Sequence, residues 1–296
     1  MGKVKWERDY NTALQESSQS NKPIFLLFQE VPGCSNCTQY GTDILSHPLM
    51  VEAIETSFVP LVVYNNKKGA DAKILQKYNE PSWNNPVVRI LNSDGKNIVA
   101  RVANFRSQTL LVSSMINALD QYSGEVPEYL RLLQKEWQLQ DDNIEEAYLS
   151  MYCFWTGEKV ISQLPGVVNT EAGFMHGKEV VKVNYNTSQT NLEDIAEEAS
   201  QSKCADQVFV DGEFNGELKS RKVGKYRKDK ADKYYLRQTN YINIPMLTTQ
   251  MTLVNGAVGR NENPNKYLSP RQLEFLNLDE NLVGIDQAIH ENWWKG

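Results

Sequence analysis

The sequence predicts a two-domain protein of the α/β (α+β) class, on three observations. Short apolar runs alternate with segments whose apolar residues recur at helical spacing, which is typical of sheets flanked by helices. A Ser-Gly-Glu-Val-Pro break separates two such stretches. The length of 296 residues is sufficient for two domains, each with its own core. We therefore expect a first domain over residues 1–122, a linker helix over 123–142, a second domain over 143–260 and a C-terminal extension over 261–296.

The elements of the first domain are predicted from hydrophobic periodicity. Apolar residues recur at helical spacing from Trp6, and the run at 23–28 indicates a buried strand. An Asn-Ser-Asp-Gly sequence is typical of the turn of a hairpin. The expected elements that follow the first strand are a helix opening at His47-Pro48, a strand at 58–64, a helix at 70–78, strands at 87–91 and 98–102, and an amphipathic helix at 110–119.

The second domain is predicted in the same way, after a connecting helix over 128–139. Strands are expected at 147–151, 180–185 and 207–210, with an amphipathic helix at 192–200. Residues 219–233 hold eight lysines or arginines and two aspartates. This basic segment could attract an anionic partner, but a solvated helix face is the interpretation that we favour. An amphipathic tail with Trp293 and Trp294 ends the chain.

Composition narrows the class of protein. An apolar content of 41% and a charged content of 23% are typical of a globular chain. The net charge of −6 argues against general nucleic-acid binding. No apolar run approaches the ~18 residues of a membrane helix, and the first residues contain no signal-peptide core. We expect a soluble cytoplasmic protein with no nucleic-acid or membrane partner, although an exported protein whose leader has been removed also fits.

The most informative motif is a pair of cysteines, Cys34 and Cys37, directly after the first apolar run. A C-x-x-C at the start of a helix gains thiolate character from the free N–H groups there. We expect Cys34 to be the exposed attacking thiol and Cys37 the resolving thiol. Half of a structural zinc site is the alternative, but the chain offers only Cys153, Cys204 and three separated histidines as further ligands. Redox chemistry is therefore favoured, with no metal and no cofactor besides the cysteines.

The succession of strand, C-x-x-C, helix, strand, helix, strand, hairpin and helix over residues 3–122 resembles the thioredoxin fold. In that family a cis-proline faces the dithiol, and Pro86 occupies the matching place. The resemblance therefore implies a cis bond at Pro86 and contact between this residue and the substrate. The chain departs from the family at Leu27, where thioredoxins carry a buried aspartate, and in the residues around the two cysteines.

A second motif, Cys153-Phe154-Trp155 with Glu158 shortly after, resembles the hallmark of the A-type peptide methionine sulfoxide reductases. A Gly-Val segment at 166–174 and the strand that follows Glu179 extend this resemblance over residues 146–211. It implies a second domain of ferredoxin-type α+β architecture. The chain departs from the family at Tyr152, where reductases have glycine, and it lacks their downstream Gly-Thr-Gln-Tyr-Arg-Ser motif.

The resemblance also implies a role for each residue of this motif. Cys153 would be the sulfur nucleophile, Phe154 and Trp155 the apolar wall for an S-methyl group, and Glu179 the proton donor. Phe174 stands where the family has a hydrogen-bonding tyrosine and would also line the substrate pocket, and Tyr226, Tyr234, Tyr235 or Tyr241 could replace the tyrosine donor. These residue types suit the chemistry, because a sulfoxide is a poor electrophile until a neighbouring acid protonates its oxygen. Aromatic side chains would remove water from both groups.

These observations lead to two hypotheses for function. The first is a thiol-dependent oxidoreductase, in which the dithiol recycles Cys153 directly or through Cys204 as a resolving thiol. Fusion would favour this, because it raises the effective concentration of a reductant to about millimolar. The expected partners are a sulfoxide- or disulfide-containing protein or small molecule, with an external thiol reductant as a further candidate. The alternative is a degenerate, non-catalytic domain that binds a thiol, a peptide or a soft metal ion through Cys153 and Cys204.

Overall fold

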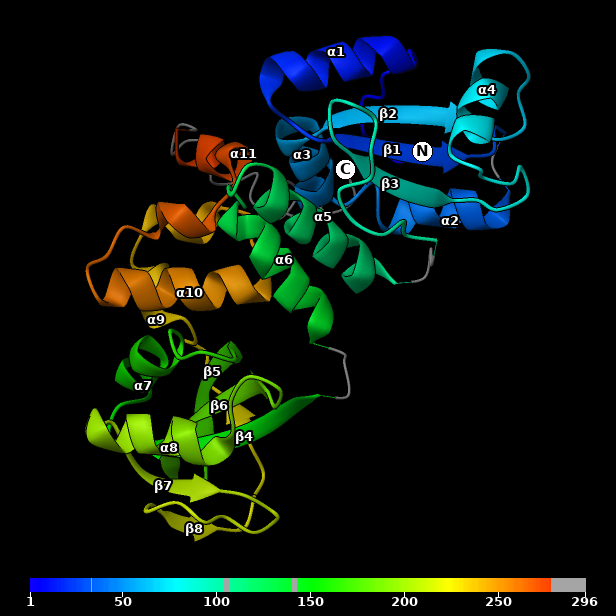
Figure 1. Cartoon of the computed structure of the whole chain (residues 1–296). Helices are drawn as coiled ribbons and strands as arrows, with labels where there is room; N and C mark the ends of the chain where they lie inside the picture. Colours follow the sequence, from blue (N-terminus) through cyan, green and yellow to red (C-terminus); the bar gives the residue numbers. More distant parts are fainter. Residues whose placement is uncertain (33, 104–106, 140–142, 278–296) are drawn as a thin grey trace. The chain divides into compact units, whose positions relative to one another are not determined.

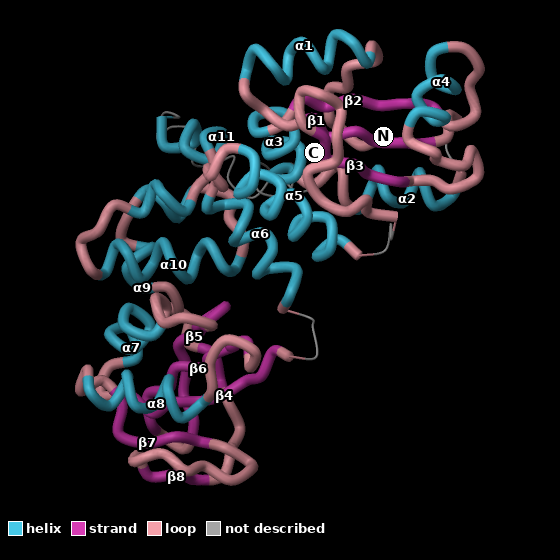
Figure 2. The backbone as a smooth tube through the Cα atoms, viewed as in Figure 1, coloured by secondary structure: helices cyan, strands magenta, loops and turns pink. Residues whose placement is uncertain are grey.

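The computed structural model describes residues 1–277 except 33, 104–106 and 140–142. These residues fall into two compact units, and the boundary lies between Gln134 and Lys135, within helix α6 (Glu128–Gln138) (Figure 1). Each unit has a sheet of its own (Figure 2). The predicted tail with Trp293 and Trp294 lies outside the described residues.

The first unit is built on a three-stranded sheet in the order β2–β1–β3. The central strand β1 (Ile24–Gln29) pairs in parallel with β2 (Val59–Tyr64) and antiparallel with β3 (Val87–Leu91). All six residues of β1 are buried. Burial of both alternating sets of side chains means that both faces of the sheet are covered, which explains why this strand is an uninterrupted apolar run in the sequence.

Three helices of the first unit begin within two residues of their predicted starts, at Pro48, Ala70 and Gln108, whereas the first begins at Tyr10 and not near Trp6. The Asp9 carboxylate caps α1 by accepting from the N–H of Thr12, and Pro48 stands in the first turn of α3. Ala13 and Leu75 belong to one core cluster with residues of the sheet, so α1 and α4 pack on the same face. The helices are α1 (Tyr10–Ser20), α2 (Ser35–Asp43), α3 (Pro48–Ser57), α4 (Ala70–Lys77) and α5 (Gln108–Tyr122).

The strand predicted at 98–102 is not formed. After the turn the chain meets β3 only at two isolated bridges, one between Val102 and Val88 and one between Asn97 and Leu91. Within 98–102 only Val102 is buried. The segment therefore has no continuous apolar face with which to maintain a ladder.

The second unit has the strand and helix order βαββαβ. Its strands lie in the order β7–β4–β6–β5, and all neighbours in this set are antiparallel, which is the ferredoxin-type arrangement. Two short strands extend the sheet, β8 beside β7 and β9 beside β5. The elements are β4 (Ile144–Met151), α7 (Phe154–Ile161), β5 (Val167–Met175), β6 (Lys178–Asn186), α8 (Leu192–Gln201), β7 (Ala205–Phe209), β8 (Lys219–Arg221) and β9 (Arg227–Lys228).

Two features of this unit differ from the prediction. The basic segment 219–233 is not a helix face: it contains both edge strands, β8 and β9. Strand β5 was not predicted, because Asn169, Thr170 and Glu171 interrupt its apolar alternation. Thr170 is nevertheless fully buried, and the hydrogen bond that its hydroxyl donates to Glu158 compensates for the loss of water. Tertiary hydrogen bonds thus stabilise a strand that the sequence pattern does not indicate.

A set of helices follows the sheet in the second unit. Helix α10 packs against α7, α9 and β5. Gln250 and Gln272 are fully buried, and their side-chain amides hydrogen-bond each other. The described part of the C-terminal extension is therefore anchored to α10. The elements are α9 (Tyr234–Arg237), η1 (Asn240–Asn243), α10 (Thr248–Gly259), η2 (Pro264–Tyr267), α11 (Pro270–Glu274) and η3 (Phe275–Asn277).

Candidate functional site

The dithiol lies at the start of α2, in the first unit. Cys34 is the N-cap residue and Cys37 lies in the first turn, with their Sγ atoms 3.2 Å apart and both thiols free. Cys34 is partly exposed, whereas Cys37 is fully buried. Burial raises the pKa of the Cys37 thiol to about 11. The two thiols therefore differ in accessibility in the direction that the C-x-x-C prediction requires.

The residue before Pro86 also contacts the dithiol. The Asn85–Pro86 peptide bond is cis, as the sequence resemblance implied. The Asn85 carboxamide Oδ1 lies 2.8 Å from Cys37 Sγ and 3.3 Å from Cys34 Sγ, and it accepts from both thiols. Sequence reasoning did not single out Asn85. Its position directly before Pro86 is the signal that could have found it.

The second cysteine site lies where β4 ends and α7 begins. Cys153 is the N-cap residue of α7, in extended conformation and partly exposed. The N–H of the next residue, Phe154, donates to Glu179 Oε2 at 2.9 Å. The Glu179 carboxylate, on β6, therefore lies at the start of the helix that Cys153 caps. The free N–H groups and the dipole at that helix end favour a negative charge there.

Aromatic rings surround the start of α7. The Phe154 ring lies 5.3 Å from Phe174 in an edge-to-face arrangement and 5.5 Å from Trp155. Tyr234 stacks on Trp155, with the centroids 4.0 Å apart and the planes 13° apart. Of the four tyrosines that the sequence left open, Tyr234 is the one in ring contact with Trp155. These rings form an apolar surface at the start of α7.

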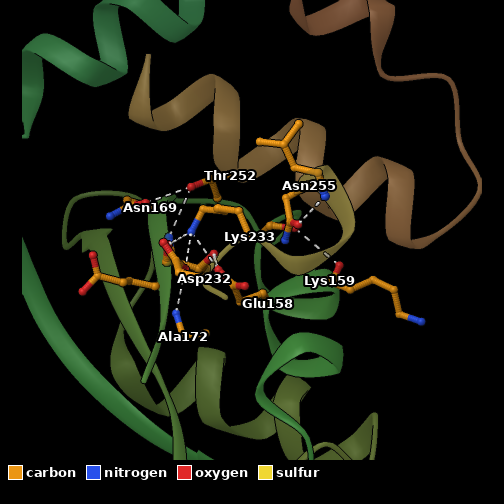
Figure 3. Close-up of polar contacts among 12 residues, drawn as sticks. Glu158, Lys159, Asn169, Ala172, Asp232, Lys233, Thr252 and Asn255 are labelled. Atoms are coloured by element: carbon orange, nitrogen blue, oxygen red, sulfur yellow. Dashed lines mark hydrogen bonds and ion pairs between the residues drawn. The ribbon is translucent and has the colours of Figure 1, made fainter. Parts of the chain in front are cut away.

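A buried ion pair holds Tyr234 in this place (Figure 3). Lys233 adopts the left-handed conformation, φ 60°, and its Nζ lies 2.7 Å from Glu158 Oε1 on α7. It also donates to the Thr170 carbonyl on β5. The neighbouring Asp232 accepts from the Ala172 N–H at 3.0 Å, also on β5. The segment before Tyr234 is thereby joined to both α7 and β5.

The surroundings of this network shift the pKa values of its two buried carboxyl groups. Burial raises the pKa of Glu158, and the Lys233 ammonium opposes that shift. For Asp232 burial acts in the same direction, but Lys233 and the Ala172 N–H outweigh it and lower the pKa of the carboxyl. The Lys233 ammonium therefore pairs with two buried carboxylates, of which Asp232 also pairs with Lys228. Lys233 is costly to remove, because Glu158 would remain buried without its ammonium partner.

Comparison with known families identifies two parts of the chain. Residues 5–93 match a family described as thioredoxin-like, and residues 145–200 match peptide methionine sulfoxide reductase. The chain thus joins a thioredoxin-like domain to a domain that is similar to peptide methionine sulfoxide reductase. These similarities support a thiol-dependent oxidoreductase in general terms.

Individual proteins resemble parts of the chain. The peptide methionine sulfoxide reductase MsrA of Methanococcus maripaludis (strain C7) is 32% identical over 72 residues, covering 19% of this chain and 46% of that protein. The chain thus spans about half the length of this curated relative. A solved structure titled DsbH oxidoreductase is similar at 22% identity and a TM-score of 0.34, covering 40% of this chain and 85% of its own.

The fourth cysteine of the chain lies next to the reductase-like site but points into the core. Cys204 is 3% exposed, and its Sγ donates to the Ala199 carbonyl at 3.2 Å. Burial raises the pKa of this thiol. Its own carbonyl accepts from the N–H of Tyr152, the residue before Cys153. The two backbones are therefore adjacent, but a disulfide requires the Cys204 side chain to leave its packing, so its resolving role stays a prediction.

The remaining site predictions concern metals and membranes. Among the residues that the structure describes, no group of three or more His, Cys, Asp or Glu side chains could hold a metal ion. In the same described ranges, no helix has the length and apolar content needed to cross a bilayer. Phe174 and Trp155 lie at the site, as set out above, whereas their roles as substrate wall remain predictions.

Proposed function

We propose that the second domain reduces an S-methyl sulfoxide with Cys153 as nucleophile and Glu179 as proton donor. The observation that carries this proposal is the 2.9 Å hydrogen bond from the Phe154 N–H to Glu179, which brings the carboxyl group to the residue after Cys153. The aromatic rings beside it supply the apolar surroundings in which a protonated sulfoxide and a thiolate react.

The proposed reaction transfers one oxygen atom. Glu179 protonates the sulfoxide oxygen while the Cys153 thiolate attacks the sulfur, and a bond forms between the two sulfur atoms. The oxygen then moves to Cys153 with its proton, while the substrate S–O bond and the transient bond between the sulfur atoms break. This leaves a Cys153 sulfenic acid, a Glu179 carboxylate and a thioether product. The substrate sulfur is reduced by two electrons and Cys153 is oxidised by two.

Cys153 must then be reduced for another turnover. A second thiol condenses with the sulfenic acid, releases water and forms a disulfide. We assign the electrons for this step to the thioredoxin-like dithiol, with Cys34 as the attacking thiol, and to Cys204 if it leaves the core. An external thiol reductant is the remaining source. We place this cycle in the cytoplasm, where thiol systems keep cysteines reduced.

The proposal is tested by incubating the fully reduced chain with N-acetylmethionine sulfoxide and measuring the thioether product. The wild type should form product in proportion to protein, and Cys153→Ser should form none. Cys204→Ser is the matched control, because Cys204 is buried and is proposed to act only after the oxygen transfer, so this variant should still form at least one equivalent of product. Product formation by Cys153→Ser equal to that of the wild type would contradict the proposal. A folded wild type that forms no product would instead support the alternative of a binding module.

A further inference from the structure

An arginine lies in line with the candidate catalytic groups across three strands. Arg227 on β9 is directly opposite Phe174 on β5, and Phe174 is directly opposite Glu179 on β6. Directly opposed residues of antiparallel strands present their side chains on the same face. Phe174 contacts Phe154 of α7, so this is the face on which Cys153 caps its helix. Glu179, Phe174 and Arg227 therefore form a row across three strands. This row begins beside Cys153 and ends at the edge of the sheet.

The guanidinium of Arg227 is held in place but not neutralised. Its Cζ lies 4.6 Å from the centroid of the Phe174 ring. Stacking of this kind uses the flat face of the group and leaves the N–H donors at its edge free. Among the described residues Arg227 has no hydrogen bond and no ion pair with another side chain, and it is exposed to solvent.

The neighbouring lysine shows the opposite behaviour. Lys228 follows Arg227 on β9 and so faces the other side of the sheet. Its Nζ lies 2.6 Å from Glu171 and 3.0 Å from Asp232, and it is therefore fully paired within the domain. Alternation along β9 thus directs the unpaired cation toward the cysteine site and the paired cation away from it.

We propose that Arg227 binds a carboxylate of the substrate and thereby selects S-methyl sulfoxides that carry a negative charge near the sulfur. This inference rests on the function proposed above. A substrate whose sulfur meets Cys153 has its methyl group against the aromatic wall, and the rest of the molecule extends along the row toward Arg227. The positive charge of Arg227 attracts the anionic end of the substrate to the end of the row away from Cys153, and this attraction orients the substrate. The fork of an arginine suits the two oxygens of a carboxylate.

The carboxylate has two sources that a test can separate. The first is the α-carboxylate of a free or C-terminal methionine sulfoxide, and the second is the side chain of a neighbouring aspartate or glutamate. The first is probed by N-acetylmethionine sulfoxide against its methylamide. The second is probed by the capped peptides N-acetyl-methionine sulfoxide-glutamate amide and its glutamine counterpart.

The experiment measures kcat/KM for both pairs with wild type, Arg227→Gln and Arg221→Gln. Arg221 is the matched control, because it is an exposed arginine on β8, at the opposite edge of the same sheet. The wild type and Arg221→Gln should prefer the charged member of at least one pair by roughly tenfold, the value of one hydrogen-bonded charge contact. In Arg227→Gln that preference should fall to near one, mainly through KM.

The outcomes distinguish this inference from the function on which it rests. A wild type that reduces charged and neutral substrates equally overturns the inference but leaves the proposed function intact. An unchanged preference in Arg227→Gln, or an equal loss in Arg221→Gln, also overturns it. A wild type that reduces none of the four sulfoxides contradicts the proposed function itself. A preference confined to one pair identifies the source of the carboxylate.

Discussion

Each of the two cysteine pairs has one partly exposed thiol and one buried thiol. Cys34 and Cys153 both cap a helix at its N-terminus, whereas Cys37 and Cys204 are packed in the protein interior. At a helix N-terminus the unpaired N–H groups stabilise a thiolate, and in the interior the loss of water destabilises it. Within each pair, one cysteine is therefore accessible to a reaction partner and the other is shielded from it.

Alkylation should distinguish Cys34 from Cys37. A thiol whose pKa is about 11 has only about one molecule in ten thousand as thiolate at pH 7. Iodoacetamide at that pH should label Cys34 first, and peptide mass spectrometry can follow both sites. Cys34→Ser and Cys37→Ser provide the single-thiol controls. Faster labelling of Cys37 would contradict the assignment of Cys34 as the attacking thiol.

Glu179→Gln should lower sulfoxide reduction by roughly 10²–10⁴-fold, the usual contribution of a general acid, because an amide cannot deliver the proton. The amide oxygen can still accept from the Phe154 N–H, so the fold should be retained. Glu198→Gln, which changes an exposed glutamate on α8, should have no effect. The measurement is the rate of thioether formation together with a circular dichroism spectrum. Full activity of a folded Glu179→Gln would remove the proposed proton donor.

His47 should make the thioredoxin-like domain sensitive to mild acid. Burial lowers the pKa of this imidazole from 6.5 to about 4. Between these values the unfolded chain takes up a proton that the folded chain does not, so stability falls as the pH falls from 6.5 toward 4. The side chain is half-buried, and we expect a loss on the order of 2 kcal/mol. Urea unfolding at several pH values between 6.5 and 4 should show this loss of the free energy of unfolding in the wild type and not in His47→Gln. If the free energy of unfolding depended on pH equally in both proteins, the assignment would be contradicted.

The residues that the sequence singled out and those that it missed differ for a physical reason. Cys153, Phe154 and Trp155 are consecutive, so a local motif was enough to find them. Asn85 directly precedes Pro86, so the same local signal could have found it, whereas Arg227 reaches its site only through the register of β9 with β5, which no local pattern encodes. Their roles depend on residues far away in the chain.

At the scale of elements, local patterns were most successful where burial is continuous. The run at 23–28 that predicted β1 is apolar throughout, and the amphipathic helix α8 begins at Leu192 as expected, whereas α1 begins at Tyr10, four residues after its expected start. The pattern failed for β5, because the polar Thr170 is stabilised by Glu158 on another element. It also failed at 219–233, where two short edge strands replace the expected helix. Both failures occur where tertiary partners outweigh local preference.

The buried ion pair between Lys233, directly before α9, and Glu158 on α7 should stabilise the contact between these two elements. Lys233→Met should destabilise the second domain by about 3–5 kcal/mol, because it leaves the Glu158 charge buried without its partner. Combining it with Glu158→Leu should recover most of that loss, since both charges are then absent. Urea unfolding of the two single variants and the double variant measures the coupling. Additive losses in the double variant would show that the pair does not act as a unit.

At the scale of the whole molecule, the chain combines two sources of thiol chemistry. A thioredoxin-like domain supplies a dithiol, and a reductase-family domain supplies a cysteine beside a carboxylate. We proposed that electrons pass from the first to the second. In a fused chain this transfer should follow first-order kinetics that do not depend on protein concentration, because the reductant is covalently attached.

Whether the transfer rate depends on protein concentration can be measured by varying that concentration at a fixed, limiting amount of sulfoxide. The decay rate of oxidised Cys153 should stay constant in the wild type and become negligible in Cys34→Ser. A rate that rises in proportion to protein concentration would indicate transfer between molecules. Equal decay in both proteins would show that an external reductant is needed.

In the proposed reaction Cys153 takes the oxygen atom of a sulfoxide, and an ¹⁸O label on that oxygen tests this transfer most directly. A variant with Cys34, Cys37 and Cys204 changed to serine cannot condense Cys153 into an intramolecular disulfide. It is treated with one equivalent of N-acetylmethionine sulfoxide labelled with ¹⁸O, and the Cys153 peptide is analysed by mass spectrometry. We expect a Cys153 sulfenic acid that carries the ¹⁸O label, formed together with an equal amount of thioether. Thioether formed without label on Cys153, or a Cys153 that stays reduced in the folded protein, would contradict it.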